Sequence, residues 1–227
     1  MLDNILINSK MPKVLYCHSS IHPSVVNSAA TVFPCLSLAS SFIGVLINIG
    51  DNNDDSIEEL RKEFQKIDNG FDELTKEINE VINNIKLETM QTQFAPLEKN
   101  LERQHKEYMK VINAPPEEMS HRFDKFEKVY QETERDGNLW TLYESMIGVS
   151  SMSTDPILKV FKEGLDNKRD AMTKVCDHLV YLLSIGCITM LANAMRCGGN
   201  MEALEQEWEE KMKRVFEEIE KTLKDCQ

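Results

Sequence analysis

Glycine and proline are scarce in this sequence, with 9 and 7 among 227 residues. Collagen-like, linker-like and low-complexity disordered chains need far more of both, so these classes are excluded. Basic residues are also in the minority, because 26 Lys and Arg face 38 Asp and Glu and leave a net charge of -12. Nucleic-acid-binding proteins usually present a basic surface, so we expect no nucleic-acid partner.

Catalytic motifs are missing as well. The sequence contains no Walker loop and no G-x-G-x-x-G, G-x-S-x-G or H-E-x-x-H string. Its six cysteines include no C-x-x-C pair, which leaves a zinc ribbon or a thioredoxin-like site without support. Reduced thiols in an intracellular protein are the simpler interpretation. We therefore expect no enzyme activity, no cofactor and no small-molecule substrate.

Two Glu-x-x-His strings come nearest to a metal motif. They run from Glu102 to His105 and from Glu118 to His121. Di-iron helical bundles use such a pair on each of two helices, together with further Glu residues. Here a Pro-Pro pair separates the strings, and each lies beside an apolar stripe rather than within it. We interpret them as chance matches and predict no metal ligands.

Charge is absent from a long stretch near the N-terminus. Residues 14–50 contain no Asp, Glu, Lys or Arg, whereas residues 51–227 carry 24 basic and 37 acidic side chains. The composition predicts an apolar segment over 1–50, packed on the bundle or inserted from it, and a helical bundle domain over 51–227. The apolar run starts far from the N-terminus and contains Pro34, so we do not expect a cleaved signal peptide.

A strict heptad stripe follows the apolar segment. Ser56 and Glu59 fit a capping box, and nine apolar residues then recur at spacings that alternate between 3 and 4. This pattern predicts one long helix with a narrow seam, which needs a partner helix from this chain or from a second copy. The seam residues are Ile57, Leu60, Phe64, Ile67, Phe71, Leu74, Ile78, Val81 and Ile85.

Three further helices are predicted in the middle of the chain. A stripe over 87–111 has a shifted phase, so we expect a kink or break near Pro96. A helix opened by Pro116 and closed by Asp136-Gly137 comes next, and a short helix over 139–147 follows. The residues predicted to face inward in these two helices are Met119, Phe123, Phe126, Tyr130, Leu139, Leu142, Tyr143 and Met146.

Two long helical segments are predicted in the C-terminal part. The first starts with Asp155 as its cap and continues without a strong breaker to Cys197. The second begins at Asn200 and has an outer face rich in Glu-to-Lys or Glu-to-Arg pairs at i,i+4, which stabilise a solvated helix. Its predicted inward positions are Leu204, Trp208, Met212, Val215, Ile219 and Leu223, with Trp208 as a core anchor rather than a membrane-belt residue.

Two charge-free runs, 29–49 and 179–195, permit two interpretations. A bilayer core needs about 20 apolar residues in a helix, within a range of about 17–25, so both runs could contact a membrane. Alternatively, both could be the buried centre of a large bundle, with His178 as the polar cap before the second run. The candidates for membrane contact are Phe33, Leu36, Leu38, Phe42, Ile43, Val45, Leu46, Leu179, Leu182, Leu183, Ile185, Ile188 and Leu191.

Several strings in the chain resemble one known family. They are FQKIDNGFDELTKEINEV (64–81), YMKVIN (108–113), NLWTLYESMIG (138–148), the start at Asp155 and the Gly-Cys-Ile string at 186–188. Over about residues 50–227 they resemble the rapunzel family of fish proteins. The resemblance implies a helical protein without assigned catalytic residues, with apolar, membrane-associated segments and an association with fin and skeletal development. The overall plan is also similar to that of helical pore-forming toxins of the cytolysin A type.

The sequence thus predicts an all-α fold, an elongated bundle of long amphipathic helices around one or two apolar helices. We expect a non-enzymatic protein that acts by helix-mediated association and engages membrane lipid, in a pore-forming-like manner. The alternative is a soluble coiled-coil scaffold that binds itself or another helical protein. We expect a cytoplasmic location with membrane association, with secretion left open.

Overall fold

The computed structural model describes Lys62, residues 94–149 and residues 155–227. The predicted seam over 57–85 and the apolar run over 29–49 lie outside these described residues. Six α-helices form within the described ranges, and those ranges contain no β-strand, which confirms the all-α class. The helices are α3 (Ala95–Ile112), α4 (Pro116–Glu132), α5 (Gly137–Ile147), α6 (Ile157–Gly164), α7 (Arg169–Arg196) and α8 (Met201–Lys224).

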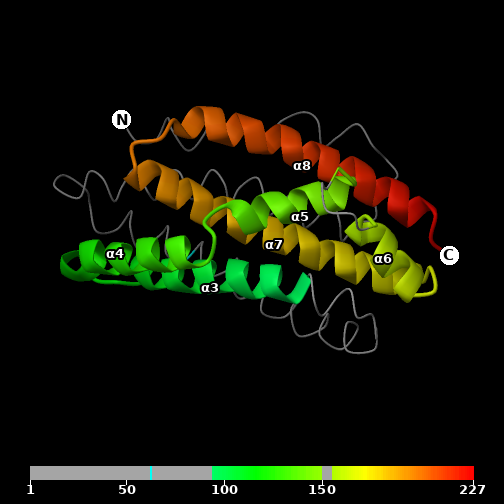
Figure 1. The fold of residues 1–227 in the computed structure, drawn as a ribbon, viewed down its shortest axis with the longest axis horizontal. Helices are drawn as coiled ribbons and strands as arrows, with labels where there is room; N and C mark the ends of the chain where they lie inside the picture. The colour runs from blue at the N-terminus through cyan, green and yellow to red at the C-terminus, as the bar shows by residue number, and fades with distance from the viewer. Residues whose placement is uncertain (1–61, 63–93, 150–154) are drawn as a thin grey trace.

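The longest helix, α7, is the centre of the described bundle. It packs against α3, α5, α6 and α8, while α4 packs on α3 (Figure 1). The pairs α3–α4 and α7–α8 each run antiparallel (Figure 1). At about 1.5 Å per residue, the 28 residues of α7 give a helix of roughly 42 Å. One apolar helix wrapped by amphipathic helices is the arrangement that the sequence predicts for this region.

Short polar and proline signals set several helix ends. Asn200 caps α8, because its side chain accepts a hydrogen bond from the backbone N–H of Ala203 at 3.2 Å. Pro116 is the first residue of α4, as predicted. Gly148 ends α5 in the left-handed conformation, with φ 70°, and a Cβ there would lie 3.2 Å from Pro156 Cγ. Glycine at this position therefore allows both the left-handed backbone conformation and the close approach of Pro156.

The predicted continuous helix over 155–197 is wrong. Helix α6 ends at Gly164, and Asp166 and Asn167 follow with φ of 54° and 59° before α7 begins at Arg169. Asp and Asn tolerate the left-handed conformation better than other non-glycine residues, so two adjacent residues of these types can end a helix. The start also differs, because Pro156 rather than Asp155 holds the N-cap position of α6.

The turn between α4 and α5 also differs from the prediction. Gly137 is the first residue of α5 and does not close α4, which ends at Glu132. The buried amide of Gln104 on α3 supports this turn. Its Nε2 donates to the carbonyl oxygens of Thr133 at 3.2 Å and Arg135 at 2.7 Å, and to Thr133 Oγ1 at 2.9 Å. A polar residue in the stripe of α3 thus satisfies backbone groups that the helix end leaves without partners.

The predicted inward faces of α4, α5 and α8 are confirmed. All four stripe residues of α4 and all four of α5 are buried, as are five of the six on α8. The sixth, Leu204, is partly buried and packs against the core. On α3, the stripe residues Leu101, Tyr108 and Val111 are buried, and Pro96 lies in the first turn of the helix.

An aromatic cluster around a lysine joins α5 to α8. Trp208 is fully buried, which confirms it as a core anchor, and its ring centroid lies 5.4 Å from that of Trp140 and 5.9 Å from that of Tyr143. Lys211 Nζ lies 4.5 Å from the Trp140 centroid and 5.3 Å from that of Tyr143. Glu207 pairs with the same ammonium group at 3.1 Å. The cation and the rings therefore stabilise each other beside a predicted i,i+4 ion pair.

Candidate functional site

Helix α7 is the candidate functional element, because it contains the second of the two apolar runs. Within the described part of the chain it is the one helix that is long and apolar enough to cross a membrane, and its most apolar window is wholly buried. Buried core helices meet the same criteria of length and composition. The six predicted contact residues on α7 are each at most 1 % exposed: Leu179, Leu182, Leu183, Ile185, Ile188 and Leu191.

Those six side chains therefore belong to the core of the described bundle. They can contact lipid only if α7 leaves its neighbours or if those neighbours rearrange around it. The other seven candidates lie outside the described residues; they are Phe33, Leu36, Leu38, Phe42, Ile43, Val45 and Leu46.

Two hydroxyl groups within the apolar run, those of Ser184 and Thr189, are satisfied inside α7 itself. Ser184 Oγ donates to the Val180 carbonyl at 2.6 Å, and Thr189 Oγ1 lies 3.1 Å from the carbonyl oxygen of Ile185. Such bonds to the preceding turn hide a polar group without help from another helix. At these two positions α7 therefore does not depend on its neighbours for hydrogen bonds.

A polar link to α3 lies at the start of the run. His178 Nε2 is 2.5 Å from Glu98 Oε1, and the histidine side chain is 1 % exposed. The rings of Phe94 and Tyr181 flank the imidazole, with centroids at 6.5 and 6.0 Å. His178 Nδ1 is buried and has no hydrogen-bond partner in the described structure. An unsatisfied buried group costs about 1–3 kcal/mol, so this link stabilises the contact between α3 and α7 less than a fully paired one would.

The far end of α7 has a second link. Arg196 lies over the Phe123 ring at 5.5 Å, and its Nη2 is 3.4 Å from Asp124 Oδ1 on α4. Both side chains of this ion pair are largely exposed, so its contribution is small. Polar contacts from α7 to other helices are thus found near the two ends of the apolar run.

A glycine in the middle of α7 allows close packing. A Cβ at Gly186 would lie 2.8 Å from Leu139 Cδ1 and 3.1 Å from Leu101 Cδ2, closer than ordinary contacts allow. The leucines of α5 and α3 therefore meet at the bare backbone of α7. Sequence periodicity did not single out this glycine, because a missing side chain leaves no signal in a hydrophobic pattern.

Free cysteines mark both the buried and the exposed parts of α7. Cys176 and Cys187 are buried within the helix, and Cys197 is exposed just after it. Burial raises the pKa of the Cys176 and Cys187 thiols. The thiolate is the reactive form, so these two groups react slowly while the helix is in the bundle.

The two Glu-x-x-His strings lie in different surroundings. His105 is buried on α3, and burial lowers its pKa to about 4. His121 and Glu118 on α4 are exposed, and Glu118 pairs with Arg122 at 3.2 Å. Among the described residues, no group of three or more His, Cys, Asp or Glu side chains could hold a metal ion.

Comparison with known proteins agrees with this helical architecture. Residues 50–227 match the family model described as the cephalotoxin-like middle helical domain. The chain is also 28 % identical to protein rapunzel of Danio rerio, and the alignment covers all of both chains. No solved structure matches it. The resemblance to the rapunzel family is confirmed, and the chain is a rapunzel-like protein that belongs to the family of the cephalotoxin-like middle helical domain.

Proposed function

We propose that this protein acts without catalysis, by helix-mediated association and by membrane engagement through α7 in a pore-forming-like manner. One observation carries the proposal. A helix of membrane-spanning length and composition is held inside the bundle, and the Ser184 and Thr189 hydroxyls of its apolar run bond to carbonyl groups of the same helix. Such a helix can exchange a protein environment for lipid without exposing those polar groups.

For α7 itself the exchange keeps the apolar surface away from water, while the neighbouring helices α3, α5, α6 and α8 must rearrange to cover the faces that α7 leaves. Lipid tails are as apolar as leucine side chains, so the apolar burial of α7 is kept when it moves from the core into a bilayer. The ionisable residues Asp177 and His178 are the costly ones, and both lie at one end of the run. Near a helix end such groups reach the membrane interface at lower cost than at the bilayer centre.

Dye-loaded liposomes provide the first test. The full chain is mixed with vesicles of anionic or uncharged lipid, and dye leakage and co-sedimentation are measured over a range of pH. The proposal expects co-sedimentation with leakage in at least one condition. The absence of both dye leakage and co-sedimentation at every pH would refute membrane engagement.

The reactivity of the native cysteine thiols tests whether α7 itself contacts the membrane. In solution, a water-soluble maleimide is expected to label exposed Cys197 and to leave buried Cys187 unmodified. With vesicles, a lipid-soluble thiol reagent should modify Cys187 while the water-soluble one still does not. Cys197 is the internal control, and a Cys187→Ala variant identifies the modified peptide by mass spectrometry. Vesicle binding with Cys187 inert to both reagents would assign the membrane contact to another segment.

The second candidate function is a soluble scaffold that associates through the seam over 57–85. The complete burial of the α7 run favours it, because a buried helix needs no lipid. Sedimentation of the full chain should then show a stable oligomer that Ile67→Glu or Phe71→Glu dissociates. A monomer whose mass neither substitution changes would count against the scaffold.

The biological setting is part of the same proposal. A cytoplasmic protein with membrane association, acting in fin and skeletal development, is the setting that the family resemblance implies. Imaging of the tagged full chain in cells, followed by loss of the gene in the animal, tests location and role separately. A normal fin and skeleton after complete loss would refute the developmental part alone.

A further inference from the structure

The outer face of α3 is basic, although the whole chain has a net charge of -12. Four residues between Leu97 and Ile112 are exposed, and all four are cations. They recur at spacings of 4, 3 and 4 residues, so they form one row along the helix, roughly 16 Å long at about 1.5 Å per residue. We call this surface the basic stripe, and it consists of Lys99, Arg103, Lys106 and Lys110. The acidic residues of the same helix are only partly exposed: Glu98, Glu102 and Glu107.

The carboxylates beside the basic stripe do not neutralise it. The side chains of Lys99 and Lys106 have no ion pair or hydrogen bond within the described part of the chain. Lys110 pairs with Glu107 at 2.6 Å, but the lysine side chain is 51 % exposed and the glutamate only 16 %, so the cation faces outward. The arginine of the stripe pairs with Glu132 of α4 at 3.0 Å through Nη2, which leaves its other N–H groups available. All four cations can therefore meet an anionic surface.

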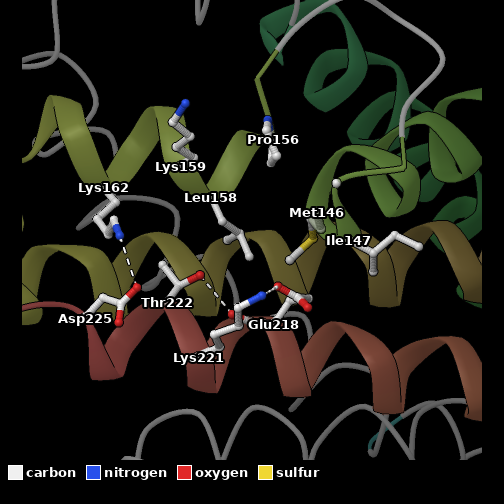
Figure 2. A pocket seen from close by; sticks show the side chains of 11 residues that line it. Met146, Ile147, Pro156, Leu158, Lys159, Lys162, Glu218, Lys221, Thr222 and Asp225 are labelled. Atoms are coloured by element: carbon white, nitrogen blue, oxygen red, sulfur yellow. Dashed lines mark hydrogen bonds and ion pairs between the residues drawn. The ribbon is translucent and has the colours of Figure 1, made fainter.

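Other lysines on the surface of the described bundle lie among carboxylates. Lys162 Nζ is 3.4 Å from Asp225 Oδ2, and Lys221 Nζ is 3.3 Å from Glu218 Oε2 (Figure 2). The exposed residues of α4, α6, α7 and α8 likewise include acids as well as bases. Among the six described helices, α3 is therefore the one whose exposed middle is entirely basic.

We propose that the basic stripe docks the bundle on the anionic head groups of a lipid bilayer. Clusters of Lys and Arg on one helix face are attracted to the negative surface potential of such a membrane. Mobile lipid head groups can gather around a single row of four cations. A nucleic acid instead carries a dense, fixed row of phosphates, which a chain of net charge -12 repels elsewhere on its surface.

The position of the basic stripe connects docking to α7. The opposite face of α3 packs on α7, where Leu101 approaches Gly186 and Glu98 meets His178. Packed helices lie about 8–10 Å apart, so docking through the stripe places the apolar helix one layer behind the membrane contact. The inference rests on the proposed membrane engagement and names the class of lipid to which the bundle binds first.

Co-sedimentation of the full chain with two kinds of vesicle tests this inference. One kind is phosphatidylcholine alone, and the other is an equal mixture of phosphatidylcholine and phosphatidylserine. We expect binding to the mixed vesicles to be at least about tenfold tighter, since each cation near an anionic membrane surface strengthens binding roughly fivefold. Binding should be lost between about 0.1 M and 1 M NaCl, because the screening length falls from about 10 Å to about 3 Å.

Paired substitutions localise the contact. Lys99→Gln combined with Lys106→Gln should weaken binding to the mixed vesicles roughly 10- to 30-fold, whereas the corresponding pair of arginine substitutions should retain it. Lys213→Gln combined with Arg214→Gln is the matched control, because it removes the same charge from exposed positions of α8 and should leave binding unchanged. All four residues are exposed, so the variants should keep the helical content of the parent, which circular dichroism checks.

The outcomes separate this inference from the proposed function. Equal binding to both kinds of vesicle, or equal losses for the α3 and α8 variants, would overturn the basic stripe and leave membrane engagement standing. Salt-sensitive, stripe-dependent binding without leakage, and with Cys187 inert to the lipid-soluble reagent, would support the stripe and refute the role of α7. Tighter stripe-dependent binding to a double-stranded DNA oligonucleotide than to the mixed vesicles would refute the choice of lipid. No binding to either kind of vesicle would refute both proposals.

Discussion

Acidification is expected to weaken the bundle through one histidine of α3. His105 is 6 % exposed, and burial lowers its pKa from 6.5 to about 4. In the unfolded chain the ring has an ordinary pKa of about 6.5, so between these two values the unfolded state binds more protons than the folded state. The contribution of His105 to stability is therefore complete above pH 6.5 and is lost as the pH falls toward 4.

The size of this effect follows from the two pKa values. The gap between 6.5 and about 4 amounts to roughly 3 kcal/mol at about 1.4 kcal/mol per pKa unit. Proton uptake by the unfolded state is only partial at intermediate pH. Between pH 7 and pH 5 the expected loss is therefore about 2 kcal/mol, which is a large fraction of the stability of a typical domain.

Urea denaturation of the parent and of His105→Gln at pH 7 and pH 5 measures this loss. The many carboxylates titrate in both proteins, so the difference between the two pH dependences isolates the histidine. The parent should lose about 2 kcal/mol more than the variant on acidification. His121→Gln, at an exposed histidine of α4, is the matched control and should behave as the parent does. Equal losses for the parent and His105→Gln would refute the reasoning.

Three further substitutions test the packing and the polar links. Gly186→Val should lower the free energy of unfolding by about 1–3 kcal/mol, because the side chain overpacks against the leucines of α3 and α5. Gly186→Ala should cost less, because alanine favours the helix by about 1 kcal/mol relative to glycine. Unchanged urea midpoints would contradict this contact. Glu98→Ala should lower the free energy of unfolding by about 1–3 kcal/mol, because it leaves His178 Nε2 unpaired. The double variant with His178→Leu should recover part of that loss. Strictly additive effects of the two substitutions would refute the link. Lys211→Met keeps the alkyl stem but should lose about 0.5–2 kcal/mol of cation–π stabilisation, whereas Lys211→Arg should retain most of it. Equal melting temperatures for the parent and these two variants would refute the contribution of the aromatic cluster.

Helix positions and inward faces within the described residues follow largely from local sequence. Asn200 predicts the start of α8 through its cap, and Pro116 predicts the start of α4 because proline lacks only an N–H that the first turn does not use. The spacing of Phe123, Phe126 and Tyr130 likewise predicts the buried face of α4. These features depend on residues within one or two turns of each other, so they can be read without knowledge of distant segments.

Contacts between distant segments could not be read in this way. The carboxylate of Glu98 meets the ring of His178 across 80 residues, and the amide of Gln104 meets Thr133 and Arg135 across 29 and 31 residues. The break at Asp166 escapes sequence analysis for a different, local reason, since no proline interrupts the pattern there and the two left-handed residues are not glycines.

The sequence by itself determined that residues 179–195 form an apolar helix, because only composition and length enter that inference. It left two surroundings open, since a protein core and a lipid bilayer accept the same side chains. The tertiary structure decided between them for the folded chain, by packing α3, α5, α6 and α8 around α7 and burying all of its apolar window. The physical reason is that burial depends on whether other helices can cover a surface, and coverage is a property of the assembled fold rather than of any one segment.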